Sequence, residues 1–130
     1  MGVDVGRSQC TTEISVCKFT PQPNGAAIKS FVNFFSIAAE DFEEQAIKLK
    51  KLFYKYKARV AVIDANGVGF GFVDFLTKTQ VDPETGDTLP PFGVLGGTFE
   101  EADKQYKKIK GVGVQENALF LMKANAPINT

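Results

Sequence analysis

Residues 60–69 read VAVIDANGVG, an apolar run that ends in Asp64 and continues into a glycine-bearing turn. Near the start of the chain, residues 2–8 read GVDVGRS and repeat this arrangement around Asp4. The near-continuous β-branched run over 59–63 is typical of a strand that is buried on both faces. If the two strands are sheet neighbours, both carboxylates emerge at one edge, where they can hold a divalent metal ion against a phosphodiester.

The composition indicates one soluble domain with carboxylate chemistry. The chain has 130 residues, of which 44% are hydrophobic and 23% charged, and its formal net charge is zero. Any contact with DNA must therefore come from a local basic patch. The absence of histidine excludes Ser-His-Asp and Cys-His catalysis and histidine-ligated zinc. No signal sequence or membrane span is predicted, and Cys10 and Cys17 are expected to be reduced thiols of an intracellular protein.

The first third of the chain predicts an antiparallel meander. Residues 2–5, 12–19 and 27–37 have the composition of strands. Pro23-Asn24-Gly25 marks a turn between the second strand and the third, because Asn-Gly tolerates positive φ angles.

A helix is predicted from Asp41 to Lys57. Asp41 can cap its amino end, with Glu44 three residues later as the capping-box partner. The apolar positions follow helical spacing, with lysines among the remaining positions. The apolar stripe consists of Phe42, Ala46, Leu49, Phe53 and Tyr56, and the lysines are Lys48, Lys50, Lys51 and Lys55.

The rest of the chain completes an α/β order. We expect a second helix after the glycines to about Lys78, a loop or small surface hairpin over 79–91, a short helix at the start of 104–113, and a strand over 118–123. This order predicts a single ribonuclease H-like domain over residues 1–130, with a mixed β-sheet, an antiparallel three-strand meander and flanking helices. In that fold the first strand lies beside the strand that ends at Asp64.

The paired aspartates predict a two-metal site for Mg²⁺ or Mn²⁺. Two metals about 3.5–4 Å apart can activate a water and stabilise the departing oxygen, provided that a carboxylate bridges them. Asp4 is the bridging candidate and Asp64 the second catalytic ligand. Further phosphate or DNA contacts are predicted for Arg7 and Ser8 and for Lys104, Lys107 and Lys108.

Each of these features also has a structural interpretation. An aspartate before glycine is a common turn residue, and the lysines after residue 103 can form a solvated face. Asp74 is more simply an exposed helical acid than a site residue. The abundant phenylalanines are expected mainly in the core rather than in a base-stacking platform. Gly67, Gly69 and Gly71 do not make a dinucleotide fingerprint, because Phe72 stands where it needs glycine.

Three segments resemble the C-terminal nuclease domain of the large terminase subunit of tailed bacteriophages. These are Gly2-Val3-Asp4-Val5-Gly6, residues 62–69 (VIDANGVG) and Leu121-Met122-Lys123-Ala124-Asn125. The resemblance implies an endonuclease that cuts concatemeric double-stranded viral DNA with Mg²⁺ or Mn²⁺ in the cytoplasm of the bacterial host. It also implies an ATPase domain on the same chain, and the small terminase subunit and the portal as partners.

The resemblance assigns Asp4 and Asp64 to two of the three metal-binding acids of the family. The third acid lies on a helix that would begin near Thr130, so the chain given is expected to be truncated before that helix and to show little activity alone. A nearby acid such as Glu116 is the alternative third ligand. The other classes considered are an actin-like or sugar-kinase ATPase half-domain, whose second phosphate loop residues 65–69 do not supply, and a non-catalytic packaging module on the same fold.

Overall fold

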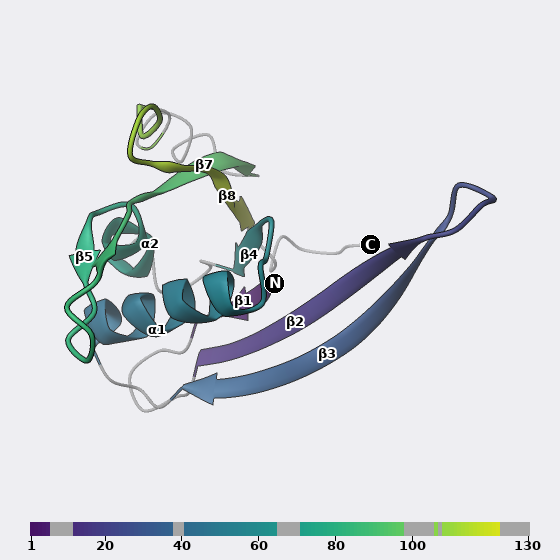
Figure 1. The fold of residues 1–130 in the computed structure, drawn as a ribbon, viewed down its shortest axis with the longest axis horizontal. Coiled ribbons are helices and arrows are strands. Elements are labelled where there is room, and N and C mark those ends of the chain that lie inside the picture. Colours follow the sequence, from purple (N-terminus) through teal and green to yellow (C-terminus); the bar gives the residue numbers. More distant parts are fainter. Residues whose placement is uncertain (6–11, 38–40, 65–70, 98–105, 107, 123–130) are drawn as a thin grey trace, which may run out of the picture.

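The protein is described by a computed structural model that covers residues 1–5, 12–37, 41–64, 71–97, 106 and 108–122. Its main element is a six-stranded mixed sheet in the order β3-β2-β1-β4-β8-β7, with two helices beside it (Figure 1). The α/β class predicted from the sequence is confirmed, and so is the adjacency of the first strand to the strand that ends at Asp64.

The predicted meander is present as β1 (Gly2–Asp4), β2 (Thr12–Pro21) and β3 (Ala27–Ile37), paired antiparallel. The turn between β2 and β3 lies at Asn24 and Gly25, where Gly25 has a φ of 86° and the Asn24 Oδ1 accepts from the Ala26 amide at 3.0 Å. β2 continues two residues past its predicted end. With β3 it forms a long curved arm that extends away from the rest of the molecule (Figure 1).

Three parallel strands complete the sheet: β4 (Ala61–Asp64), β8 (Gln115–Met122) and β7 (Phe92–Gly97). β8 begins three residues before the predicted strand. β7 was not predicted at all, because its sequence FGVLGG is half glycine and lacks the alternation that marks a strand. Packing requires glycine at position 97, because a Cβ there would lie 2.3 Å from the carbonyl oxygen of Leu121 on β8.

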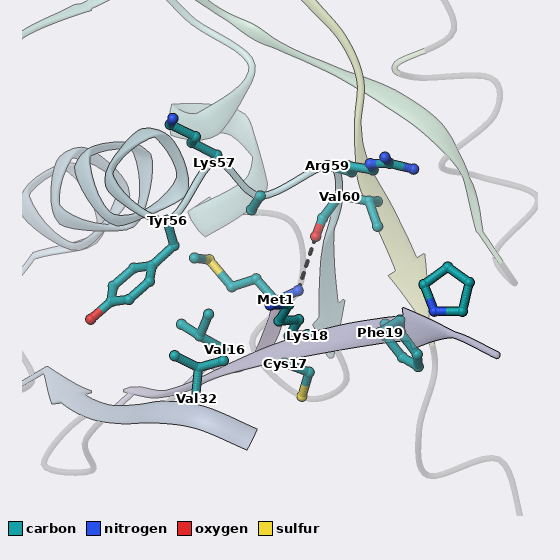
Figure 2. A pocket seen from close by; sticks show the side chains of 12 residues that line it. Met1, Val16, Cys17, Lys18, Phe19, Val32, Tyr56, Lys57, Arg59 and Val60 are labelled. Atoms are coloured by element: carbon teal, nitrogen blue, oxygen red, sulfur yellow. Dashed lines mark hydrogen bonds between the residues drawn. The ribbon is translucent and has the colours of Figure 1, made fainter. Parts of the chain in front are cut away.

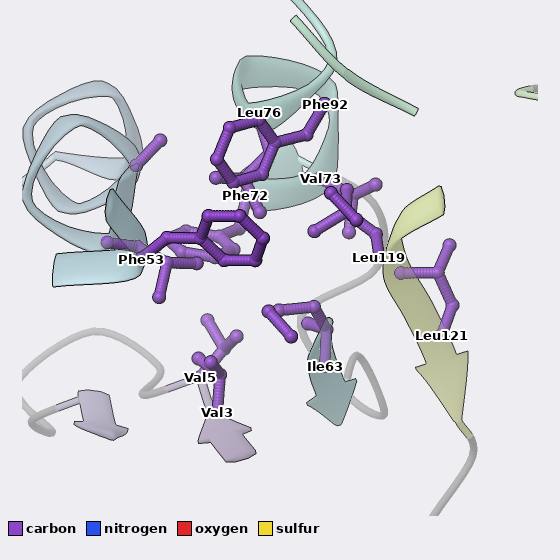
Figure 3. Packing of buried hydrophobic residues seen from close by; sticks show 14 of the residues in the cluster. Val3, Val5, Phe53, Ile63, Phe72, Val73, Leu76, Phe92, Leu119 and Leu121 are labelled. Atoms are coloured by element: carbon purple, nitrogen blue, oxygen red, sulfur yellow. The ribbon is translucent and has the colours of Figure 1, made fainter. Parts of the chain in front are cut away.

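Both described helices lie on one face of the sheet, α1 (Phe42–Lys55) and α2 (Gly71–Leu76). Asp41 is the N-cap of α1 as predicted, and its Oδ1 accepts from the amide of Glu44 at 2.9 Å. The core between helices and sheet holds Phe53 from α1, Phe72 from α2, and Ile63 and Leu121 from the strands (Figure 3). Ala46, Leu49 and Phe53 are buried and Phe42 is partly buried, which confirms these positions of the apolar stripe, whereas Tyr56 is the C-cap residue just after the helix.

Lys50 stands outside the predicted apolar stripe of α1, yet its side chain is fully buried. Its Nζ donates to the carbonyl oxygens of Lys78, at 2.8 Å, and Pro90, at 2.9 Å, and lies 5.2 Å from the ring centroid of Phe92. These two carbonyls flank the predicted surface hairpin, which is present as β5 (Gln80–Val81) and β6 (Thr88–Leu89). Lys50 thus ties this hairpin to α1.

The other face of the sheet carries neither α1 nor α2. Successive side chains of a strand point to opposite faces. Val3 of β1 and Ile63 of β4 are buried under the helices. On the opposite face, Val62 of β4 is only half-buried and Asp4 of β1 is exposed. The prediction that the Asp64 strand is buried on both faces is therefore wrong for the part of the chain that the structure describes. We call this second side the open face.

Candidate functional site

Asp4 and Asp64 occupy directly paired positions on neighbouring parallel strands. The register of β1 and β4 pairs Gly2 with Val62 and Asp4 with Asp64, so both aspartates stand at the carboxyl ends of their strands and face the same side of the sheet. Neighbouring strands lie about 4.8 Å apart. This is the juxtaposition expected from the sequence, and it arises because each apolar strand ends at its aspartate.

A third carboxylate, Glu13, extends this pair across the sheet. The antiparallel register of β1 and β2 makes Glu13 the partner of Asp4, on the side opposite Asp64. The Ser36 hydroxyl of β3 donates to the Glu13 Oε2 at 2.5 Å. Glu13 was not predicted as a site residue, although the alternation of Thr12, Glu13 and Ile14 places it on the face opposite the core. We call Glu13, Asp4 and Asp64 the acidic row.

The acidic row borders a shallow cavity on the open face of about 410 Å³. Its walls include Phe34 of β3, Val62 of β4 and Met122 of β8, together with all three carboxylates. Asp4 is exposed and Asp64 half-buried. The carboxylate oxygens can therefore contact a solvated ligand, while the other walls named above are apolar.

The donor chemistry of the acidic row suits a hard divalent cation, but the row does not form a closed cage. Carboxylate oxygens are the ligands that Mg²⁺ and Mn²⁺ prefer, and Mg²⁺ keeps several waters when one or two carboxylates hold it. No group of three or more histidine, cysteine, aspartate or glutamate side chains in the described part of the chain is arranged to hold one ion. The row fits a weak, largely hydrated metal site centred on Asp4 and Asp64.

The other predicted site residues do not join the acidic row. Arg7, Ser8, Lys104 and Lys107 lie outside the described residues, and Lys108 is an exposed turn residue. Glu116 is wrong as a third ligand, because it stands near the start of β8 whereas Met122, near its end, pairs with Asp64. The Glu116 Oε1 instead accepts from the Gly111 amide at 3.1 Å.

Asp74 is a structural residue rather than an exposed acid. It is half-buried on α2, on the helix side of the sheet, and its Oδ1 accepts from the Tyr106 hydroxyl at 2.7 Å. Burial, reinforced by the Asp74 carboxylate, raises the pKa of Tyr106 far above its usual range. Tyr106 therefore stays protonated and fixes α2 to the segment before β8.

A second cavity, of about 700 Å³, opens at the amino ends of β1 and β4, away from the acidic row (Figure 2). Lys18, Lys57 and Arg59 contribute positive charge to its lining, and no acidic side chain is among the described residues that line it. Val16, Phe19 and Val32 supply apolar walls. We call it the basic cavity. It was not predicted, because its cations come from two separate parts of the chain, β2 and the segment after α1.

Comparisons of the chain with protein-family models, curated proteins and solved structures find no match. Among the described residues, no helix is both long enough and apolar enough to cross a lipid bilayer. Cys17 is a half-buried free thiol on β2, and Cys10 lies outside the described residues. A function for this chain has to be inferred from its own residues and their geometry.

Proposed function

We propose that the chain is a divalent-metal-dependent DNA endonuclease domain with a ribonuclease H-like fold. The observation that carries this proposal is the register that pairs Asp4 with Asp64 at the carboxyl ends of two neighbouring parallel strands. The order β3-β2-β1-β4, antiparallel up to β1 and parallel beyond it, supports the same fold. Neither of the described helices covers the open face, so a nucleic acid can approach the carboxylates from that side.

In this function Asp4 and Asp64 hold the metal and thereby place the scissile phosphate. Their side chains are short, and their backbones are fixed by sheet pairing on both sides of β1 and β4, so the carboxylate oxygens have little freedom. Bound Mg²⁺ or Mn²⁺ supplies an activated water and stabilises the leaving oxygen. Glu13 adds negative charge on the far side of Asp4 and strengthens the attraction of the row for cations.

The biological setting that we propose is the packaging of a bacteriophage genome. The segments around Asp4 and Asp64 support it, since they resemble the nuclease domain of the large terminase subunit. The substrate is then concatemeric double-stranded DNA in the host cytoplasm, and the partners are an ATPase domain on the same chain, the small terminase subunit and the portal.

The first test is metal binding. We expect millimolar Mn²⁺ to broaden the amide NMR signals of residues next to Asp4 and Asp64, because a paramagnetic ion relaxes nearby nuclei. Asp4→Asn should abolish this effect and keep the fold. Asp87→Asn is the matched control, because Asp87 is an exposed acid in the β5–β6 hairpin. Broadening that is centred elsewhere, or that survives Asp4→Asn, would refute the metal site.

The second test is cleavage of supercoiled plasmid with Mn²⁺ at low salt. We expect slow nicking that Asp4→Asn and Asp64→Asn each reduce by at least 100-fold, an order of magnitude typical for removal of an electrostatic catalytic group. Asp87→Asn should cut like the unaltered protein. Metal binding without any Asp4-dependent cleavage would favour a non-catalytic packaging module, and binding of ATP in calorimetry would favour the kinase-like class.

A further inference from the structure

Three phenylalanines form an exposed line along the arm. Phe34, Phe31 and Phe19 are 65%, 55% and 63% exposed. Phe34 pairs with Ser15 and Phe31 with Cys17, and Phe19 follows two residues after Cys17. Ser15, Cys17 and Phe19 are alternate residues of β2 and share a face, and the register shift between Val16 and Cys17 brings Phe31 to the same face as Phe34. All three phenylalanine side chains therefore point to the open face. Most of the described phenylalanines lie in or against the core, as predicted, so these three are exceptions, and we call them the aromatic stripe.

The rings of the stripe offer flat, accessible π surfaces. Phe31 and Phe34 are stacked, with ring centroids 5.2 Å apart and planes inclined by 23°. The Lys29 Nζ lies 4.9 Å from the centroid of Phe31. Exposed apolar surface of this extent is rare on soluble proteins unless something binds it. Planar groups that stack, such as nucleobases, are suited to these rings.

The charge around the stripe favours an anionic partner. Residues 14–39 contain Lys18 and Lys29 but no aspartate or glutamate, although the whole chain has equal numbers of acidic and basic residues. Phe19 also borders the basic cavity, but Val16 and Lys18 of that cavity alternate with Cys17 and Phe19 on β2 and so face the helix side (Figure 2). Lys29, which pairs with Phe19 and lies over the Phe31 ring, brings positive charge to the face of the stripe. A polyanion on the open face of the arm therefore meets Lys29 and no described acid until it reaches the acidic row.

The inner end of the stripe opens on the acidic row. Phe34 lines the same cavity as Asp4 and Asp64. From Ser15, the partner of Phe34, to Phe19, strand β2 advances four residues, or about 13 Å at 3.3–3.4 Å per residue. The aromatic stripe thus leads from Lys29 to the carboxylates along the open face.

We propose that the aromatic stripe binds a single-stranded segment of nucleic acid and leads it to the acidic row. Its bases stack on Phe19, Phe31 and Phe34, and its phosphates lie near Lys29. An intact duplex keeps its bases stacked inside and offers the rings only its sugar-phosphate surface. The inference builds on the proposed nuclease and specifies its substrate as DNA that is unpaired next to the cut.

The direct test uses tryptophan fluorescence, because the chain contains no tryptophan. Phe31→Trp introduces a single reporter into the stripe, and Leu95→Trp introduces one at an exposed apolar position of β7, which is 55% exposed. Titration with a 15-nucleotide oligothymidylate in EDTA should quench the first reporter and leave the second unchanged. Oligouridylate tests whether RNA binds as well as DNA does, and either polymer supports the stripe.

The affinity test uses alanine variants and fluorescence anisotropy of a labelled oligothymidylate. Stacking contributes about 1–3 kcal/mol per base, so Phe31→Ala and Phe34→Ala should each weaken binding about 5- to 150-fold. Leu95→Ala should bind like the unaltered protein, and a duplex of the same length should bind more weakly. Circular dichroism of each variant checks that the fold is kept.

Three results would overturn the inference. They are equal quenching by duplex and single strand, unchanged affinity in both alanine variants, and a dimer in light scattering that Phe31→Ala dissociates, which would assign the stripe to a second copy of the chain. The binding assays run in EDTA and so do not depend on cleavage. Stripe binding without Asp4-dependent cutting would refute only the nuclease, and Asp4-dependent cutting without stripe binding would refute only this inference.

Discussion

Lys50 is a buried cation whose charge is stabilised by backbone carbonyls rather than by any acid that we observe among the described residues. Burial lowers its pKa to about 8, against about 10.4 for an exposed lysine. The unfolded chain therefore binds more protons than the folded chain between these two values, and the free energy of unfolding must rise with pH in that window. The cost of burying the charge is fully present below pH 8 and disappears as the pH approaches 10.

We therefore expect Lys50→Met to remove a pH dependence rather than simply to change stability. Urea unfolding at pH 7.5, 8.5 and 9.5 should show the unaltered protein gaining stability relative to Lys50→Met at each step. Lys48→Met, on the exposed side of the same helix, should follow the profile of the unaltered protein. Parallel profiles for the unaltered protein and Lys50→Met would mean that Lys50 is no harder to charge in the folded state than in the unfolded state.

At the scale of elements, strand β7 depends on glycine where it meets β8. A Cβ on Gly97 would come within 2.3 Å of the Leu121 carbonyl oxygen, whereas a Cβ on the adjacent Gly96 would come no closer than 3.9 Å to the Phe120 ring. The first contact is with backbone and has no rotamer to relieve it. These two adjacent glycines of β7 therefore serve different purposes.

Gly97→Ala should destabilise the fold by about 1–3 kcal/mol, the usual range for overpacking. Gly96→Ala should change stability by less than about 0.5 kcal/mol, as is usual for substitutions that create no clash. Chemical denaturation of both variants gives the comparison directly, and hydrogen exchange at the amides of β7 and β8 locates the loss. Equal effects of the two substitutions would show that the close approach to Leu121 does not limit the strand.

The same elements show what could be read from the sequence and why. The meander and α1 with its Asp41 cap could be predicted, because period, cap and turn are local signals. The pairing of Asp4 with Asp64 was predicted from the order of strands and helices along the chain. The β7 strand, the burial of Lys50 and the inclusion of Glu13 in the acidic row could not, because each depends on a neighbour distant in the sequence. The exposure of the aromatic stripe was missed for the same reason, since alternation gives the face of a strand but not what covers it.

At the scale of the whole molecule, the zero net charge conceals a separation of charge across the sheet. Glu13, Asp4 and Asp64 stand side by side on three adjacent strands. The basic cavity, with Lys18 and Arg59, lies at the opposite end of β1 and β4. Like charges on directly opposed strand positions destabilise a sheet by roughly 0.2–1 kcal/mol. The fold thus tolerates a small electrostatic cost at the position where a cation would be bound.

This arrangement predicts that Mn²⁺ changes the difference in stability between the unaltered protein and Asp4→Asn. Without divalent cations, Asp4→Asn removes the charge between Glu13 and Asp64 and should raise the melting temperature by about 2 °C, the shift expected for about 0.5 kcal/mol in a domain of this size. With 10 mM Mn²⁺, the unaltered protein should gain stability by ligand linkage while Asp4→Asn should not, so their melting temperatures should converge or cross. Scanning calorimetry in EDTA and in Mn²⁺ measures both, with Asp87→Asn as the control for loss of a charge elsewhere. If Asp4→Asn is less stable than the unaltered protein in EDTA, Asp4 is a structural acceptor; if Mn²⁺ stabilises both proteins equally, the ion binds away from the acidic row.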